Sequence, residues 1–398
     1  MQPPAAPDRR APLRRRPRAL SALVVCLGAL APATVADPAA ASGTPDDRML
    51  QRRPEAFVDG PGGPPGAIAV LRRDGRTRVV RAGVADLGTG RAPRTTDHMR
   101  LASTAKALSG AVALSLVDRH RLRLDDTLRE RLPRSPSAWG KVTLRQLLNH
   151  TGGLPDYSDS PLFRAQVQAD PHRRFDPHHL LDYVAGRPLP FRPGSRYHYS
   201  NSDNIAVALM AEAATGTPYE KLLRTLVQRP LGLRDTSLPQ GYRLPAPSLH
   251  GYDVSPPGPP VDVSELLSAS GAWASGGIVS TPADATRFVR GYAGGALYGR
   301  EVVREQRRWR PGASQPAGPG RNSTGLGIFR YRTRCGVVLG HTGNFPGYTQ
   351  LMAATPDGRR SLTFSVTRQI NADLTPALLA RMRALQEDFV CGLLRGRG

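Results

Sequence analysis

Segments with strand character cluster near the two ends of the chain, and the long middle is dominated by apolar segments with helical spacing. β-Branched, aromatic and other apolar residues bounded by Gly or Pro are typical of strands. Apolar residues three and four apart are typical of helices that pack on a core. This distribution predicts an α+β fold with one antiparallel sheet built from both terminal parts. The predicted strands span 67–71, 77–82, 336–339, 348–354 and 361–367.

Helical segments are expected at both ends of the chain and throughout its middle. The first and last of them should flank the sheet, and the middle ones should form an inserted all-helical lobe. We therefore expect an α/β lobe of about 44–100 and 276–395 and a helical lobe of about 101–275. The main helical segments are 45–58, 102–117, 143–149, 205–214, 219–229 and 376–394.

Residues 1–36 have the features of an export signal. Clustered Arg residues precede a short apolar core, 19–31, and small residues follow it. We expect cleavage near Ala36 or Ala41, which leaves about 37–398 as a secreted or cell-wall-associated protein. No later run reaches the roughly 18 apolar residues of a membrane-spanning helix, so we expect no stable membrane span.

The chain is strongly basic, with 55 Lys and Arg against 32 Asp and Glu and a formal net charge of +23. Such a charge could indicate a nucleic-acid-binding protein. Beyond the leader, however, the Arg residues are dispersed and gather on no periodic face, so we expect no nucleic-acid partner. Attraction to an anionic cell wall is compatible with the charge.

Three Cys residues are too few for a disulfide-dense scaffold or a four-cysteine zinc site. Cleavage of the leader would remove Cys26 and leave Cys335 and Cys391. A pair of Cys residues in an oxidising compartment favours a disulfide, which would stabilise the fold by roughly 3–4 kcal/mol. Two buried free thiols are the alternative.

Ser103 and Lys106 stand at the start of the apolar segment 102–117. Residues three apart on a helix share a face, so the hydroxyl and the amine can meet. A Ser hydroxyl becomes an effective nucleophile when a neighbouring base takes its proton. A buried Lys can be that base, whereas Arg stays protonated. The chain has only two other Lys residues, Lys141 and Lys221, so this one is informative.

Tyr199-Ser200-Asn201 comes shortly before the apolar segment 205–214. A Tyr could exchange a proton with the Ser oxygen or with a leaving group, and an Asn offers a donor and an acceptor to a substrate amide. The alternative interpretation is structural, because Ser and Asn are common at the first position of a helix.

The tripeptide His-Thr-Gly occurs twice. The copy at 150–152 ends a helical segment and begins a turn, so we interpret it as a structural helix end. The copy at 341–343 follows the strand 336–339. A strand edge can align with an extended substrate, and Gly permits close approach. The second copy is therefore the candidate for the site.

Ser-x-x-Lys, Tyr-x-Asn and His-Thr-Gly, in this order, resemble the three-part signature of penicillin-recognising serine hydrolases. Within that superfamily the chain is similar to class C β-lactamases and, most of all, to exported D-alanyl-D-alanine carboxypeptidases. The likeness covers most of 45–395. It implies a β-lactamase/transpeptidase-like fold, a monomer, carboxypeptidase activity on peptidoglycan stem peptides and acylation by β-lactams. It implies no cofactor and no metal.

The resemblance also implies a role for each site residue. In acyl transfer a nucleophile, a proton relay and donors for the developing oxyanion must converge. Ser103 would be the acylated nucleophile, Lys106 its activator, Tyr199 the general base and acid, and Asn201 the residue that holds the substrate amide. His341 and Thr342 would line the site and contact the substrate carboxylate beside Gly343, and the N–H groups of Ser103 and Asn344 would form the oxyanion hole.

One departure puts the carboxylate specificity in doubt. Such carboxypeptidases carry an Arg on the strand before the third motif, where this chain has Phe329, with Arg330 one place later. One residue along a strand is a change of face. A β-lactamase or an esterase on the same scaffold is the alternative enzyme. A non-catalytic cell-wall-binding protein is the alternative of another class.

Overall fold

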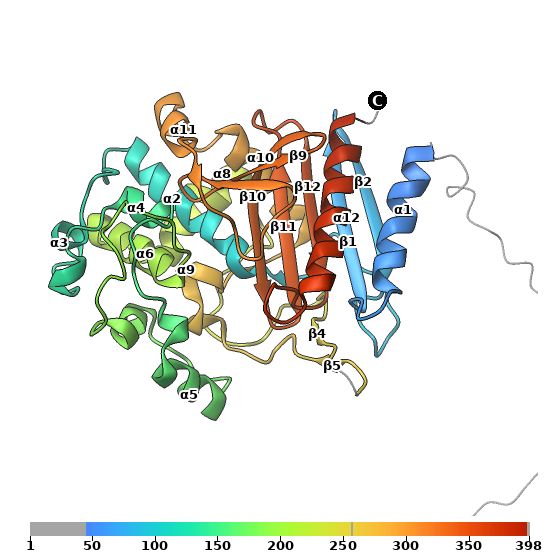
Figure 1. Ribbon diagram of the computed structural model, residues 1–398, viewed down its shortest axis with the longest axis horizontal. Helices are drawn as coiled ribbons and strands as arrows, with labels where there is room; N and C mark the ends of the chain where they lie inside the picture. The colour runs from blue at the N-terminus through green and yellow to red at the C-terminus, as the bar shows by residue number, and fades with distance from the viewer. Residues whose placement is uncertain (1–44, 256–257, 396–398) are drawn as a thin grey trace, which may run out of the picture. The chain divides into compact units, whose positions relative to one another are not determined.

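The antiparallel sheet predicted from the two ends of the chain is present in the computed structural model, which describes residues 45–255 and 258–395. The predicted signal at 1–36, with its cleavage near Ala36 or Ala41, lies outside the described residues. Eight strands follow the order β2-β1-β12-β11-β10-β9-β8-β7, and every neighbouring pair is antiparallel. The N-terminal strands therefore lie at one edge, and C-terminal strands complete the sheet (Figure 1).

The strands of the main sheet are β1 (Gly66–Arg73), β2 (Arg76–Gly83), β7 (Arg310–Pro311), β8 (Arg321–Thr324), β9 (Phe329–Thr333), β10 (Gly336–Phe345), β11 (Tyr348–Ala354) and β12 (Ser361–Val366). Two further pairs are β3 (Met99–Arg100) with β6 (Val279–Ser280), and β4 (Tyr252–Asp253) with β5 (Val261–Asp262). The hairpin β1–β2 turns at Asp74 and Gly75, which both have positive φ angles, 51° and 82°. Asp-Gly is favoured at such turns because both positions tolerate this conformation.

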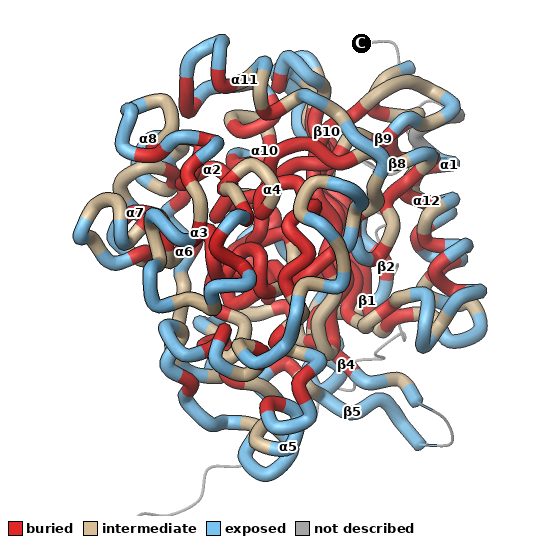
Figure 2. The backbone as a smooth tube through the Cα atoms, turned by 60° about the vertical axis from the view of Figure 1, so that its left-hand side comes forward, coloured by how far each residue is buried: buried red, intermediate tan, exposed pale blue. Residues whose placement is uncertain are grey.

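Helices cover both faces of the sheet. The terminal helices α1 (Pro45–Val58) and α12 (Pro376–Arg395) pack against each other and against β2 and β12. On the opposite face α10 (Pro282–Gly294) packs against β11, β12 and β1 (Figures 1 and 2). The continuous burial of β11 and β12 follows from this double cover.

The helices between the two parts of the sheet gather around α2 (Ala105–Asp118), which contacts α6, α7, α9 and α11. All residues of α2 from Ala105 to Leu116 are buried, and Figure 2 shows buried backbone concentrated where α2 and α6 meet the sheet. The other helices are α3 (Leu128–Arg131), α4 (Leu144–Leu148), α5 (Pro161–Ala169), α6 (Asn201–Thr215), α7 (Tyr219–Leu223), α8 (Arg229–Leu231), α9 (Trp273–Gly276) and α11 (Arg300–Gln306).

A disulfide joins Cys335, in the turn before β10, to Cys391 on α12, with 5.1 Å between their Cα atoms. The expected pairing is thus present, and it ties the strand that carries the second His-Thr-Gly to the C-terminal helix. Within the described part of the chain, no helix is both long and apolar enough to cross a bilayer.

Candidate active site

Ser103 lies in a 3₁₀ turn, Ala102–Thr104, that leads directly into α2. The preceding residue, Ala102, has a φ of 51°, a left-handed conformation that costs a non-glycine residue about 1–2 kcal/mol. Gly343 of β10 faces this turn so closely that a Cβ there would lie 2.6 Å from the backbone nitrogen of Ser103. Only Gly therefore allows the third motif to lie against the nucleophile.

Lys106 lies one turn further along and donates three hydrogen bonds from its buried Nζ. The acceptors are Ser103 Oγ at 3.1 Å, Asn201 Oδ1 at 2.7 Å and the carbonyl oxygen of Ser275 at 2.8 Å. Burial lowers the pKa of Lys106 to about 7, although the carboxylates of Asp156 and Asp203 act in the opposite direction. A sizeable fraction of this amine is therefore neutral at neutral pH.

Tyr199 lies beside this pair. Its phenol oxygen is buried and makes no hydrogen bond within the described residues, and its ring faces Lys106 Nζ, 5.0 Å from the ring centroid. Burial raises the pKa of the Tyr199 phenol, although an interaction with Ser103 lowers it. The phenol is thus protonated at neutral pH, which makes it a proton relay rather than a resting tyrosinate base.

Asn201 begins α6 and has its amide fully engaged. Its Oδ1 accepts from Lys106, while Nδ2 donates to Asp156 Oδ2 at 3.0 Å and to Ser158 Oγ at 3.1 Å. The backbone N–H of Asn201 also donates to Asp156 Oδ2, at 2.8 Å. Asp156 thus fixes the second motif and adds negative charge near Lys106. The sequence reasoning missed this residue, whose only local signal is its place after Leu154-Pro155.

The third motif brings His341 and Thr342 next to the site, but both side chains are only 1% exposed. His341 Nδ1 lies 2.5 Å from the carbonyl oxygen of Thr342, and Thr342 Oγ1 donates to the carbonyl oxygen of Pro316. Burial lowers the pKa of His341 to about 3. The expected contact of these two residues with a substrate carboxylate therefore stays a prediction, and both polar groups already have partners.

The first His-Thr-Gly also reaches the site, which the sequence reasoning did not expect. His150 has a φ of 57° at the end of α4, as suits a helix end, but its ring lies 4.5 Å from that of Tyr199. His150 Nδ1 lies 2.7 Å from Asp203 Oδ2, and both side chains are buried. Burial lowers the pKa of His150 and raises that of Asp203.

Phe329 and Arg330, where the sequence departs from the carboxypeptidase pattern, have different surroundings. The Phe329 ring packs edge-on against the His341 ring, with 4.9 Å between centroids. The Arg330 guanidinium lies over the Trp309 ring at 5.0 Å, and its Nη2 donates to Ser323 Oγ at 3.3 Å. The residue in ring contact with the third motif is therefore apolar.

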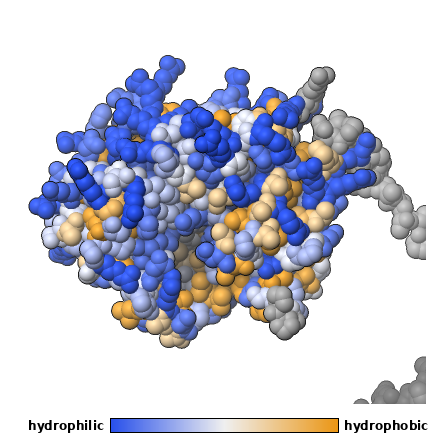
Figure 3. All heavy atoms as spheres, in the orientation of Figure 1, coloured by the Kyte–Doolittle hydropathy of each residue, from blue (hydrophilic) through white to orange (hydrophobic). Residues whose placement is uncertain are grey.

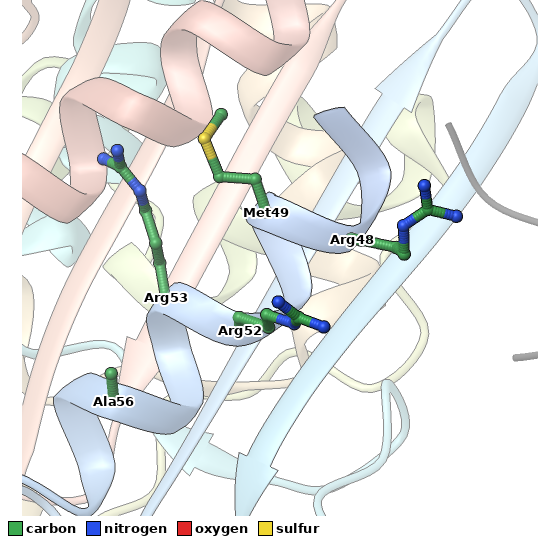
Figure 4. A pocket seen from close by; sticks show the side chains of 5 residues that line it. All are labelled: Arg48, Met49, Arg52, Arg53 and Ala56. Atoms are coloured by element: carbon green, nitrogen blue, oxygen red, sulfur yellow. The ribbon is translucent and has the colours of Figure 1, made fainter. Parts of the chain in front are cut away.

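A surface hollow of about 390 Å³ lies elsewhere, on the outer side of α1. Figure 4 shows its lining residues on successive turns of this one helix: Arg48, Met49, Arg52, Arg53 and Ala56. This hollow contains no nucleophile or general base. Figure 3 shows a face of the molecule on which hydrophilic residues predominate between hydrophobic patches, which fits the high Arg content.

Among the described residues, no group of three or more His, Cys, Asp or Glu side chains could hold a metal ion. Instead, three groups converge: the Ser103 hydroxyl, the Lys106 amine with its lowered pKa, and the buried Tyr199 phenol. Ser103 lies in the 3₁₀ turn, Lys106 on α2 and Tyr199 in the loop before α6, and β10 faces the turn. This set defines a serine hydrolase site of the acyl-transfer class.

The sequence profile of the family described as Beta-lactamase matches residues 50–386, so the chain belongs to the beta-lactamase family. It is a serine hydrolase of the superfamily that unites β-lactamases with penicillin-binding proteins. The resemblance to penicillin-recognising serine hydrolases and the predicted α+β fold class are both confirmed.

Three similar proteins illustrate the range of names in this family. Penicillin-binding protein 4* of Bacillus subtilis is 25% identical over 75% of this chain and 66% of its own length. The D-alanyl-D-alanine-carboxypeptidase/endopeptidase AmpH of Escherichia coli is 28% identical over 71% of this chain and 70% of its own. A crystal structure of a D-stereospecific amidohydrolase from Streptomyces sp. superposes with a TM-score of 0.74 and 28% identity, covering 89% of this chain and all of that one.

Proposed function

We propose that the protein hydrolyses amide bonds that follow a D-amino acid residue, through an acyl-enzyme on Ser103. The observation that carries the proposal is the direct contact of 3.1 Å between Lys106 Nζ and Ser103 Oγ, along which the neutral amine can accept the hydroxyl proton. The names of AmpH and of the Streptomyces amidohydrolase support D-configured substrates. The D-alanyl-D-alanine carboxypeptidase predicted from the sequence is one specificity within this proposal, and its peptidoglycan substrates agree with the predicted export.

In the proposed acylation, neutral Lys106 takes the proton of Ser103 while Oγ attacks the substrate carbonyl carbon. The oxyanion that forms is held by the N–H groups of Ser103 and Asn344. The proton then passes through the Tyr199 phenol to the departing nitrogen, and the C–N bond breaks. Asn201 orients Lys106 through its Oδ1; because its amide nitrogen is held by Asp156 and Ser158, it would have to release one of these contacts to hold the acyl group.

Deacylation repeats this relay with water. The Lys106–Tyr199 pair takes a proton from a water molecule, whose oxygen attacks the ester carbon, and the proton returns to Ser103 Oγ as the ester bond breaks. A β-lactam would enter by the same first step, because its ring amide opens to form an ester on Ser103. Its leaving group stays attached to the acyl group, which explains why slow deacylation is expected.

A fluorescent penicillin tests the proposal. Incubation with the purified protein should give a covalent adduct, which mass spectrometry should place on the peptide containing Ser103. The Ser103→Ala variant should form no adduct and should lose hydrolysis of N-acetyl-D-Ala-D-Ala amide. Full activity in this variant, or an adduct on another residue, would refute the proposal.

Stereochemistry and turnover sharpen the result. A substrate pair that differs only in the configuration of the acyl residue should be cleaved at least about tenfold faster in the D form, about 1.4 kcal/mol in transition-state stabilisation. Rapid release of a hydrolysed β-lactam would instead identify a β-lactamase.

A further inference from the structure

We propose that this site prefers substrates whose leaving group carries no charge, such as a peptide amide, over substrates that end in a free carboxylate next to the scissile bond. The inference rests on the proposed acyl-enzyme chemistry at Ser103 and specifies the part of the substrate that departs. Its basis is the wall formed by Phe329, His341 and Thr342.

The direction of proton transfer places the leaving group near this wall. The departing nitrogen must receive its proton from the Tyr199–Lys106 pair, so it must lie on the Tyr199 side of Ser103. Tyr199 belongs to the same buried apolar cluster as Phe329 and Tyr331. Lys106 also interacts electrostatically with His341, whose ring contacts Phe329. In this proposal, therefore, the group beyond the scissile nitrogen lies on the side of Phe329 and His341.

His341 offers no positive charge to that group. Its Nδ1 lies 2.5 Å from a carbonyl oxygen and must carry the proton to make a hydrogen bond there. Nε2 of the neutral ring is then an acceptor only. Such a nitrogen can receive a hydrogen bond from an amide N–H, whereas it repels a carboxylate oxygen.

Thr342 and Phe329 add no donor for a carboxylate. The Thr342 hydroxyl gives its only proton to the carbonyl oxygen of Pro316. Phe329 is 1% exposed and presents an aromatic ring. A carboxylate held here would lose its hydration without gaining a cation or a hydrogen-bond donor, which is strongly unfavourable.

The basic residues close in the sequence are engaged elsewhere. Arg330 extends toward Trp309 and Ser323 rather than toward His341. Arg100, on the strand that leads to Ser103, is 2% exposed and donates to the carbonyl oxygens of Ser264 and Tyr242. Both guanidinium groups therefore have their positions fixed by other contacts.

A matched pair of substrates tests the inference on the unmodified protein. N-Acetyl-D-Ala-D-Ala and its C-terminal carboxamide share the acyl group and the scissile bond, and differ only in the charge of the leaving group. We expect kcat/KM for release of D-alaninamide to exceed that for release of D-alanine by at least about tenfold. An equal or faster release of D-alanine would overturn the inference.

Substitution at the wall gives a second test. Phe329→Arg should shift the ratio of acid to amide cleavage at least about tenfold toward the acid, whereas Phe329→Leu, which adds no charge, should leave the ratio within about twofold. Arg330→Gln should also leave it unchanged. A selective loss of acid cleavage in Arg330→Gln would overturn the inference, because Arg330 would then be the carboxylate contact.

Failure of this inference is distinguishable from failure of the proposed function. If fluorescent penicillin labels Ser103 but the amide is not cleaved faster than the acid, the acyl-enzyme chemistry stands and the leaving-group preference is wrong. If Ser103 is not labelled and neither substrate is cleaved, both are wrong. The wild-type comparison decides the inference even if Phe329→Arg fails to fold.

Discussion

The chain contains the same tripeptide twice, and the histidines of both copies lie near the Lys106 amine but have different surroundings. His150 ends a helix in a left-handed conformation and turns its ring toward Tyr199. His341 lies on β10, pairs with Met352 across the sheet and turns its ring toward Phe329. Lys106 lowers the pKa of both imidazoles, so both lie close enough to sense its charge.

The difference between the copies lies in what each histidine holds in place. His150 is bound to the carboxylate of Asp203 and supports the phenol that carries the proton. His341 is bound to a backbone carbonyl, and in our proposal it borders the leaving group. The comparison teaches that the same tripeptide makes different contacts depending on the backbone that carries it. We propose that the helix end positions Tyr199 and that the strand shapes specificity.

The largest effect is expected from substitution of Lys106, whose amine lies near both copies of the tripeptide. Lys106→Arg should reduce acylation by about 10³-fold or more, nearly as much as Lys106→Ala, because guanidinium keeps its positive charge but cannot accept the Ser103 proton. Stopped-flow acylation with a fluorescent penicillin measures this. Near-normal acylation in Lys106→Arg would show that a positive charge alone suffices. Lys106 would then not be the base near which the two histidines are compared.

A smaller effect is expected when His150, in the first copy of the tripeptide, is replaced by a residue without a ring. His150→Asn keeps a donor for Asp203 but no longer supports Tyr199, so kcat should fall by about 10²-fold with KM within about twofold. His150→Phe restores a ring and should recover part of kcat, although it leaves Asp203 without its partner.

His341→Asn is the matched change in the second copy. It should alter KM or the leaving-group ratio more than kcat, because His341 borders the substrate rather than the phenol. If both Asn variants changed kcat and KM alike, the division of roles between the two copies would be wrong.

Much of this site could be predicted from the sequence, and the part that could not has a physical explanation. Ser103 and Lys106 are linked by helical spacing, which is local, so their contact follows from the sequence. The His150–Asp203 and Asp156–Asn201 contacts join residues 53 and 45 positions apart, and no local pattern specifies such pairs. The positive φ of His150 supports its structural interpretation, yet backbone shape does not show where the ring points.

The fold was predicted to a similar degree. The hairpin β1–β2 and the strands β10–β12 follow from local apolar patterns and turn residues. The local sequence predicts neither β8 nor β9, because Arg321–Thr324 and Phe329–Thr333 are polar or strongly basic; only the family resemblance places Phe329 on a strand. They are strands because they continue the sheet beyond β10, which is a tertiary effect on weak local propensity.

The pH dependence of the reaction should show one step that belongs to neither histidine. Neutral Lys106 is the proton acceptor, and its pKa is about 7, so kcat/KM should fall about tenfold per pH unit below 7 and level off above it. Burial lowers the pKa of His341 to about 3 and moves that of His150 well below its ordinary value, so we expect neither imidazole to produce the step near pH 7. Measurement of kcat/KM across pH 5–9 checks this; a step that disappeared in His150→Asn or His341→Asn would assign the titration to that histidine.

The smallest effect is expected from the two threonines that follow the histidines. Thr151 donates to Asn149 Oδ1 at 2.6 Å, and Thr342 donates to the carbonyl oxygen of Pro316; each threonine is about 3% exposed or less. Replacement by Val leaves each acceptor unpaired, which should lower the free energy of unfolding by about 1–3 kcal/mol in both variants. Denaturant unfolding measures this loss.

Activity should separate the two threonine variants, because in our proposal only Thr342 borders the leaving group. Thr342→Val should change the ratio of acid to amide cleavage, and Thr151→Val should not. An equal change of this ratio in both variants would show that the two copies do not differ in specificity.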